Sequence, residues 1–128
     1  MRRDHPTVGA ELSLAQYSSL GHVYVSPALT TAGVADRALA RRGLRRRVAL
    51  VVPSFLVAPV IAAGSDLVAT VPSRIAKMYV GRLPVRSVPV PLELPPVTVF
   101  MAWHERMRRD PGHAWFRRLL VSALGRGG

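Results

Sequence analysis

The chain has 128 residues, which is enough for one domain with a real core but not for two independent domains. Hydrophobic residues make up 49% of the sequence, so composition gives no case for disorder, and the absence of cysteine excludes disulfides, thiolate metal sites and thiol catalysis. The net charge of +11 favours contact with polyanions, but all eighteen basic residues except Lys77 are arginine, a bias that codon usage in a GC-rich genome also explains.

The amino-terminal third predicts two short helices on either side of a strand. Ser13 can cap a helix over residues 14–20, and residues 22–26 form an apolar strand. A second helix is predicted over residues 34–42, and Gly43 stands in the usual position just past a helix end. No continuous apolar run follows the basic residues at the start, so a secretory signal peptide is not expected. This and the lack of cysteine fit a cytoplasmic location.

The longest uncharged run, Val48 to Ala63, raises the question of a membrane anchor. Its sixteen residues fall short of the roughly 20 apolar residues that a spanning helix needs. Pro53 and Pro59 interrupt it, and an interior proline removes a backbone hydrogen bond that lipid cannot replace. We therefore expect the buried middle of a globular domain rather than an anchor.

The same run predicts a strand followed by a helix, and the pattern then repeats. Residues 47–52 are β-branched and continuously apolar, as in a strand covered on both faces, and Ser54 can cap a helix over residues 55–63. Residues 66–71 form another apolar strand, followed by a helix over residues 74–80. Strands that alternate with helices in this way predict an α/β fold with a parallel sheet.

The last third has a different character. Residues 83–96 contain five prolines and are expected to be an extended crossover that leaves the α/β unit, or a simple linker. Residues 97–103 predict a further strand, and Pro111 lies in the first turn of a helix that runs to about Leu124. This order predicts one complete α/β lobe plus fragments of a second lobe.

Candidate ligand-binding residues follow from the predicted sheet. In parallel sheets, ligands bind beyond the carboxyl ends of the strands, where helix amino termini present free N–H groups. Ser54 and these amides could bind a carboxylate, and the Phe55 ring could cover an apolar or aromatic body. Alternatively, Ser54 only caps its helix and Phe55 lies in the core, and Thr70 is either a pocket residue or a strand residue with its hydrogen bond satisfied. The three strand ends considered are Ser26-Pro27, Pro53-Ser54-Phe55 and Thr70-Val71-Pro72, and the residues predicted to bind the ligand are Ser26, Pro53, Ser54, Phe55 and Thr70.

Catalytic and metal sites find little support in the sequence. Ser54 is not part of a G-x-S-x-G motif, and the four histidines lack the spacing of a metal-binding motif. We predict no catalytic residue, no metal and no cofactor.

Three stretches of the sequence, "RRVALVVPSF", "SDLVATVP" and "MAWHERMRRDP", are the most specific parts of a likeness that covers about residues 2–124. They resemble the effector-binding domain of LysR-type transcriptional regulators, in particular the branch of the nodulation regulators. It implies a periplasmic-binding-protein type II fold with two α/β lobes and a small-molecule inducer between them. Residues 1–85 are then the second lobe with its leading segment, and residues 86–128 are the crossover and the terminal strand and helix of the first lobe.

The resemblance also implies how such a chain would act. It has no helix-turn-helix, so a truncated product that senses an inducer and does not bind DNA by itself is expected. Its partners would be an aromatic or carboxylate inducer and further copies of the chain. Two alternatives remain at this point: a solute-binding protein of the same fold, and a basic domain that binds nucleic acid.

Overall fold

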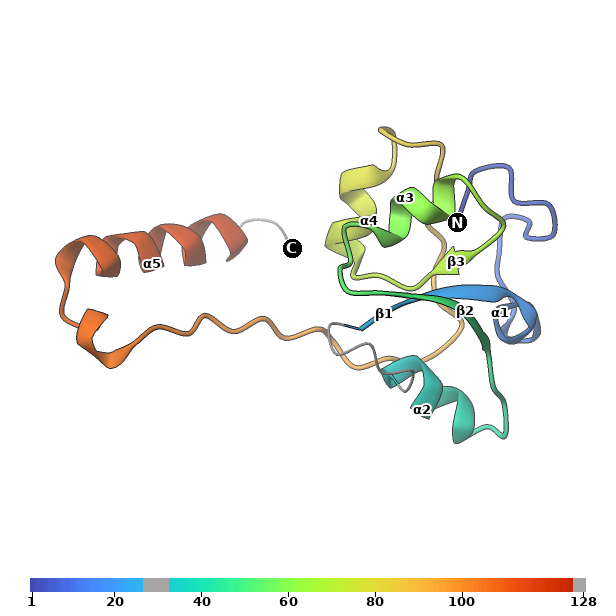
Figure 1. The fold of residues 1–128 in the computed structure, drawn as a ribbon, viewed down its shortest axis with the longest axis horizontal. Coiled ribbons are helices and arrows are strands. Elements are labelled where there is room, and N and C mark those ends of the chain that lie inside the picture. Colours follow the sequence, from blue (N-terminus) through green and yellow to red (C-terminus); the bar gives the residue numbers. More distant parts are fainter. Residues whose placement is uncertain (27–32, 126–128) are drawn as a thin grey trace. The chain divides into compact units, whose positions relative to one another are not determined.

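A computed structural model of the chain describes residues 1–26 and 33–125 (Figure 1). The chain divides into two compact units, Met1–Pro96 and Val97–Gly128. The boundary after residue 85 that the sequence suggested stays a prediction.

The first unit is built on a three-stranded parallel sheet. Strand β1 (Gly21–Val25) lies between β2 (Arg47–Val52) and β3 (Val68–Ala69), so the order is β2-β1-β3. In the register, His22 of β1 lies opposite Val48 of β2 and Val68 of β3. The predicted parallel α/β arrangement is confirmed, although the third strand is shorter than expected.

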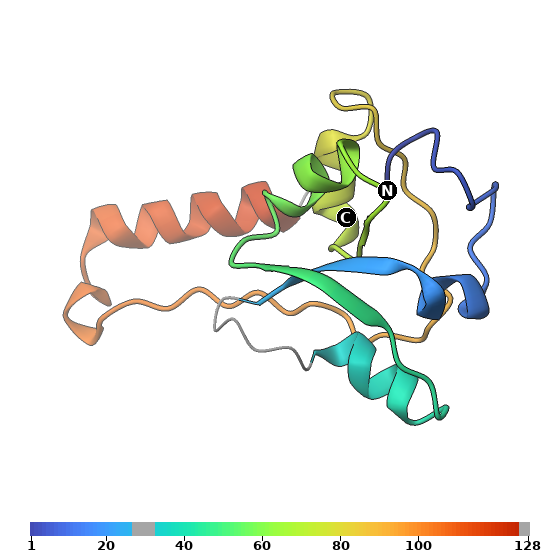
Figure 2. The same cartoon turned by 45° about the vertical axis from the view of Figure 1, so that its right-hand side comes forward.

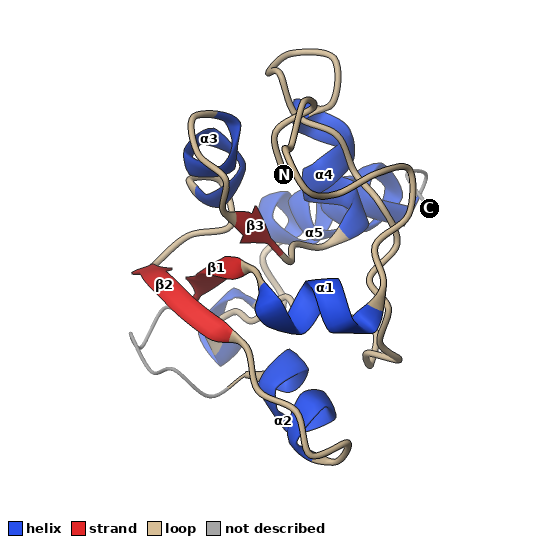
Figure 3. Ribbon diagram, turned by 90° about the vertical axis from the view of Figure 1, so that its right-hand side faces the viewer, coloured by secondary structure: helices blue, strands red, loops and turns tan. Residues whose placement is uncertain are grey.

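Four short helices surround this sheet. They are α1 (Leu14–Ser19), α2 (Val34–Ala40), α3 (Ala58–Ala63) and α4 (Ser73–Tyr79). Figures 2 and 3 show α3 and α4 on one side of the sheet and α2 on the other. The predicted cap of α1 is confirmed, since the Gln16 N–H donates to Ser13 Oγ at 3.1 Å and the Ser13 N–H donates to Gln16 Oε1 at 3.0 Å. None of the helices in residues 1–26 and 33–125 combines the length and the apolar character needed to cross a bilayer.

The start of α3 corrects the sequence-based prediction. The helix begins at Ala58 with Val57 as its N-cap, so Ser54 does not cap it. Proline lacks an N–H, so Pro59 fits only in the first turn of a helix, where that donor has no intrahelical partner. A helix starting at Phe55 would have placed the same proline in its interior.

The burial of β2 also differs from the prediction. Only Val52 is buried in this strand, and Leu50 is 40% exposed. The reason is the strand order, because β2 forms an edge of the sheet while β1 takes the centre. Val23 of β1 is accordingly fully buried, in a cluster with Val25, Val52 and Ala58.

A buried polar network connects α2 to the centre of the sheet. The Arg46 side chain is 2% exposed and pairs with Asp36 of α2 through two N–O contacts of 2.8 Å. Arg46 also lies 3.4 Å from Nδ1 of His22, a fully buried residue of β1. On its other side, Nε2 of His22 lies 2.7 Å from the backbone oxygen of Tyr17. These bonds compensate a histidine and an arginine for their removal from water.

The proline-rich segment returns along the start of the chain. Val85 forms an antiparallel bridge with Arg2, and the Arg3 N–H donates to the Pro84 oxygen at 2.7 Å. Residues 86–96 carry no helix or strand, as expected for an extended crossover.

The second unit consists of an irregular segment, a 3₁₀ turn (Glu105–Met107) and helix α5 (Pro111–Gly125). The final helix is confirmed, but the predicted strand over residues 97–103 is wrong. No described segment pairs with these residues, and Val99 and Phe100 are 79% and 84% exposed. A strand needs a neighbour for its backbone hydrogen bonds. Trp103 instead stacks against Arg117 of α5, with the guanidinium carbon 4.6 Å from the ring centroid.

The apolar face of α5 is expected to make the chain self-associate. Trp115 and Leu119 are 59% and 48% exposed, and contiguous apolar surface of this kind promotes contact between copies. Sedimentation velocity over a range of concentrations should show species larger than a monomer, and the double variant Trp115→Glu/Leu119→Glu should shift them to the monomer. The exposed alanines of the control Ala15→Glu/Ala40→Glu take the same added charge outside this face. A wild-type chain that stays monomeric at every concentration contradicts the prediction.

Candidate functional site

The carboxyl edge of the sheet is the first candidate site. The Ser26 N–H donates to the Val52 oxygen at 2.9 Å, so the ends of β1 and β2 lie together there. Ser26 is buried and Pro53 is exposed. Pro27, the neighbouring candidate, lies outside the described residues. Ser26, the described residue after β1, is therefore inaccessible to a ligand, and the open part of this edge is the segment after β2, which is exposed to solvent.

The open part is the turn Pro53–Val57, which precedes α3. Ser54 Oγ accepts a hydrogen bond from the Leu56 N–H at 3.2 Å, and the Ser54 carbonyl accepts one from the Val57 N–H at 3.3 Å. Phe55 is 37% exposed and is therefore not part of the core. This turn carries a partly exposed hydroxyl and an exposed aromatic ring on consecutive residues, which suits a ligand with a polar end and an apolar body.

Tyr79 holds this turn from a different helix. Its hydroxyl, at the end of α4, donates to the Leu56 oxygen at 2.8 Å. Sequence analysis could not connect Tyr79 with Leu56, because they are 23 positions apart and no motif links them.

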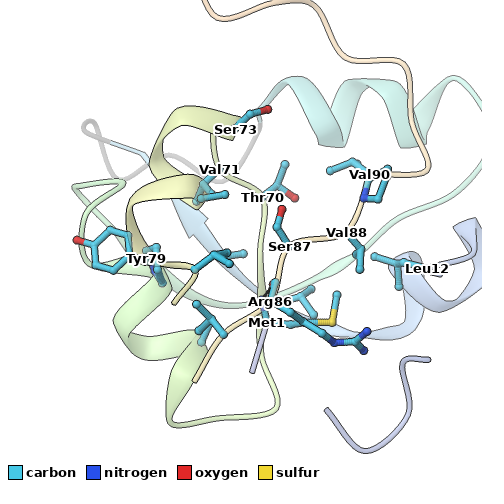
Figure 4. Close-up of a pocket in the computed structure, with 18 of the residues that line it drawn as sticks. Met1, Leu12, Thr70, Val71, Ser73, Tyr79, Arg86, Ser87, Val88 and Val90 are labelled. Carbon is cyan, nitrogen blue, oxygen red and sulfur yellow. Dashed lines mark hydrogen bonds between the residues drawn. The ribbon is translucent and has the colours of Figure 1, made fainter. Parts of the chain in front are cut away.

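Thr70 follows β3 and lies on a cavity of about 440 Å³ within the first unit (Figure 4). Its hydroxyl hydrogen-bonds to the hydroxyl of the buried Tyr17 at 2.8 Å. Thr70 therefore lines the cavity with its hydroxyl satisfied by Tyr17, and because it follows β3 it is not the strand residue of the second alternative. Figure 4 shows the Ser87 hydroxyl pointing toward Thr70.

The cavity walls come from several segments. They are the start of the chain with α1, the end of β3, helices α3 and α4, and the crossover from Val85 onward; the polar residues among the lining are Tyr17, Thr70, Ser73, Tyr79, Arg86 and Ser87. The remaining walls are mostly valine, alanine and proline. A volume of this size with few polar groups matches the usual small-molecule pocket, which ranges from about 300 to 1,000 Å³.

Among the described lining residues, Arg86 carries the charged side chain. Its guanidinium donates to the backbone oxygens of Gly9, at 2.6 Å, and Val8, while its buried Nε makes no hydrogen bond to any described residue. Sequence analysis missed Arg86 and Ser87 because the proline-rich segment predicted only a crossover or a linker.

Of the predicted site residues, the structure places only Thr70 on this cavity. Ser26, Pro53, Ser54 and Phe55 lie at the same sheet edge but outside its lining. In residues 1–26 and 33–125, no group of three or more histidine, aspartate or glutamate side chains could hold a metal ion.

Comparisons with known proteins agree on one family. The model of the LysR substrate binding domain matches residues 1–125. The HTH-type transcriptional activator NagR of Ralstonia sp. is 40% identical over 120 residues, which cover 94% of this chain and 40% of that protein. Nodulation protein D 3 of Rhizobium leguminosarum bv. phaseoli is 34% identical over 116 residues, which cover 90% of this chain and 38% of that protein.

A solved structure gives the same result. The regulatory domain of MexT, a transcriptional activator in Pseudomonas aeruginosa, superimposes with a TM-score of 0.67 at 30% identity, covering 94% of this chain and 58% of that chain. The chain spans about 40% of the length of the curated relatives it matches.

Proposed function

Because this chain belongs to the LysR substrate-binding domain family, we propose that it senses a small-molecule inducer for a LysR-type transcriptional regulator. The relatives are HTH-type regulators, and in the proposed regulator a helix-turn-helix elsewhere would bind DNA. The proposal includes a cytoplasmic location, assembly with further copies and no catalytic step.

The observation that carries this proposal is the match of residues 1–125 to the family, together with a sheet edge that suits a small ligand. Ser54 would bind a carboxylate or another polar group, and Phe55 would cover the apolar body. Thr70 lies at the same edge and borders the cavity. The resemblance to regulators rather than to solute-binding proteins disfavours that alternative.

The mechanism would be a shift of population. An inducer can change a regulator only if it binds one arrangement of the lobes more tightly than another. The resulting free-energy difference would alter the geometry of an oligomer and, through it, that of the bound DNA.

Substitutions at the turn test the proposed contact. Calorimetric titration with a panel of small carboxylates, starting with benzoate, should show about tenfold weaker binding for Ser54→Ala, which removes a hydrogen bond to a charged group. Phe55→Ala should weaken binding by a similar factor because it removes apolar contact area. Val60→Ala is the control, since Val60 is an exposed residue of α3.

A substitution in the cavity wall distinguishes a ligand bound at the turn from a ligand bound in the cavity. Ser87→Leu places an apolar side chain in the cavity wall and leaves the turn intact. Loss of binding in the two turn variants but not in Ser87→Leu would support the assignment. If both turn variants bind like the wild type and only Ser87→Leu fails, Ser54 and Phe55 are not the ligand contacts.

A further inference from the structure

The last turn of α2 and the connection from it to β2 carry an arginine cluster outside the candidate inducer site. Arg37, Arg41, Arg42 and Arg45, which we call the arginine turn, are all exposed. Within the described residues, none of these four side chains forms a hydrogen bond or an ion pair. The one acidic residue nearby, Asp36, is already paired with the buried Arg46.

The backbone of the arginine turn is fixed rather than loose. Gly43 adopts a positive φ of 68°, the left-handed conformation that ends many helices. The Gly43 N–H donates to the Ala40 oxygen at 3.0 Å, and the Leu44 N–H donates to the oxygen of the fully buried Leu39 at 3.0 Å. These two bonds form a Schellman motif, so the turn holds its arginines on a rigid backbone. A preorganised backbone lowers the entropy lost when they bind a partner.

The arginine turn lies at the amino-terminal end of β2, whereas the candidate inducer site lies at the carboxyl end of the same strand. It leads into Arg47, the first residue of β2, whereas Ser54 follows the last residue of the same strand. Six residues of strand span about 20 Å. Figure 1 shows the connection from α2 entering β2 at the end away from α3. A partner at the arginine turn and an inducer at the carboxyl edge could therefore be bound together.

We propose that the arginine turn binds the phosphate backbone of duplex DNA without reading its sequence. Arginine binds phosphate through two parallel N–H bonds, and four exposed guanidinium groups on one short segment concentrate the positive charge that a phosphate backbone attracts. A protein partner is disfavoured, because residues 37–47 expose no aromatic or large apolar anchor for an interface core. Single-stranded nucleic acid is disfavoured for the same reason, since its bases need aromatic rings for stacking.

Fluorescence anisotropy of a labelled mixed-sequence duplex, titrated with the 128-residue chain, tests this surface. The triple variant Arg41→Gln/Arg42→Gln/Arg45→Gln should bind about tenfold or more weakly at low salt. The slope of log K against log salt should become shallower by about 0.9 for each phosphate that the variant no longer neutralises. The matched control is Arg106→Gln/Arg109→Gln/Arg118→Gln, three exposed arginines of the second unit. It removes the same charge and should keep most of the affinity and the slope.

The outcomes separate a local surface from the effect of net charge. A selective loss of duplex binding in the arginine-turn variant, with Ser54→Ala binding duplex like the wild type, supports the proposal and does not bear on whether Ser54 contacts an inducer. Equal losses in the two triple variants would mean that net charge alone attracts DNA, which overturns it. It is also overturned if the chain ignores duplex but binds poly-glutamate, because the partner is then an acidic polypeptide. Circular dichroism spectra of both variants establish that they are folded.

Discussion

Asp36→Ala is expected to destabilise the first unit by about 3 kcal/mol, because it leaves the Arg46 guanidinium buried without its counter-ion. The Arg46 side chain is 2% exposed, so water can solvate the unpaired guanidinium only in part. Burial acts to raise the pKa of Asp36, but the hydrogen bonds from Arg46 and the Gly33 backbone outweigh it, and the pKa lies below its ordinary value. The alanine variant also loses the 2.8 Å bond from the Gly33 N–H that caps α2.

Urea unfolding followed by circular dichroism measures this effect, with Arg46→Met and the double variant as comparisons. Arg46→Met should be less damaging, since Asp36 is 23% exposed and can be solvated. In Asp36→Ala/Arg46→Met no buried charge remains at this position, so much of the stability should return. If the double variant is no more stable than Asp36→Ala, the unpaired guanidinium is not the cause.

The sequence predicted those parts of the fold that depend on local chemistry. Ser13 with Gln16, and Gly43 beyond α2, each define a helix end through bonds within a few residues. Local patterns failed where a segment distant in the sequence determines the position or the pairing of a strand. The apolar run of β2 indicated a central strand, but the order of the three strands places it at an edge. Residues 97–103 have the composition of a strand and no described neighbour to pair with.

In the candidate site, too, local patterns predicted some residues and missed those that distant segments bring in. Placing Ser54, Phe55 and Thr70 at one sheet edge requires only the rule that parallel strands end together. Tyr79 and Ser87 reach that region through helix packing and the path of the crossover, which no local pattern encodes. The start of α3 could have been predicted from the sequence, because a helix tolerates Pro59 only in its first turn.

His22 is expected to make the stability of the first unit depend on pH. The pKa of His22 lies at about 4, below the ordinary 6.5, because burial and, to a smaller extent, the charge of Arg46 lower it more than the hydrogen bond to the Tyr17 oxygen raises it. The unfolded chain therefore takes up a proton near pH 6.5 and the folded chain only near pH 4. Stability is full above pH 6.5, falls as the pH is lowered toward 4, and loses about 3 kcal/mol over that window.

The geometry explains why protonation is unfavourable. With Nε2–H donating to the Tyr17 oxygen, Nδ1 of neutral His22 is left to accept from the Arg46 guanidinium at 3.4 Å. A proton on Nδ1 would place two positive groups against each other in a buried site. Asp36 acts in a different window: its folded pKa is lowered, so its contribution is present above pH 3.8 and is lost as the pH falls below that value.

Urea unfolding at a series of pH values from 7 to 4 tests the role of His22, with His22→Gln as the comparison. Glutamine does not titrate and can still donate to the Tyr17 oxygen, so this variant should be less stable at pH 7 yet nearly flat between pH 6.5 and 4. The difference between the two curves should shrink as the pH falls, because only the wild type takes up a proton on unfolding in that window. Parallel curves would show that other groups cause the pH dependence, and a flat wild-type curve would show that His22 keeps an ordinary pKa in the folded chain.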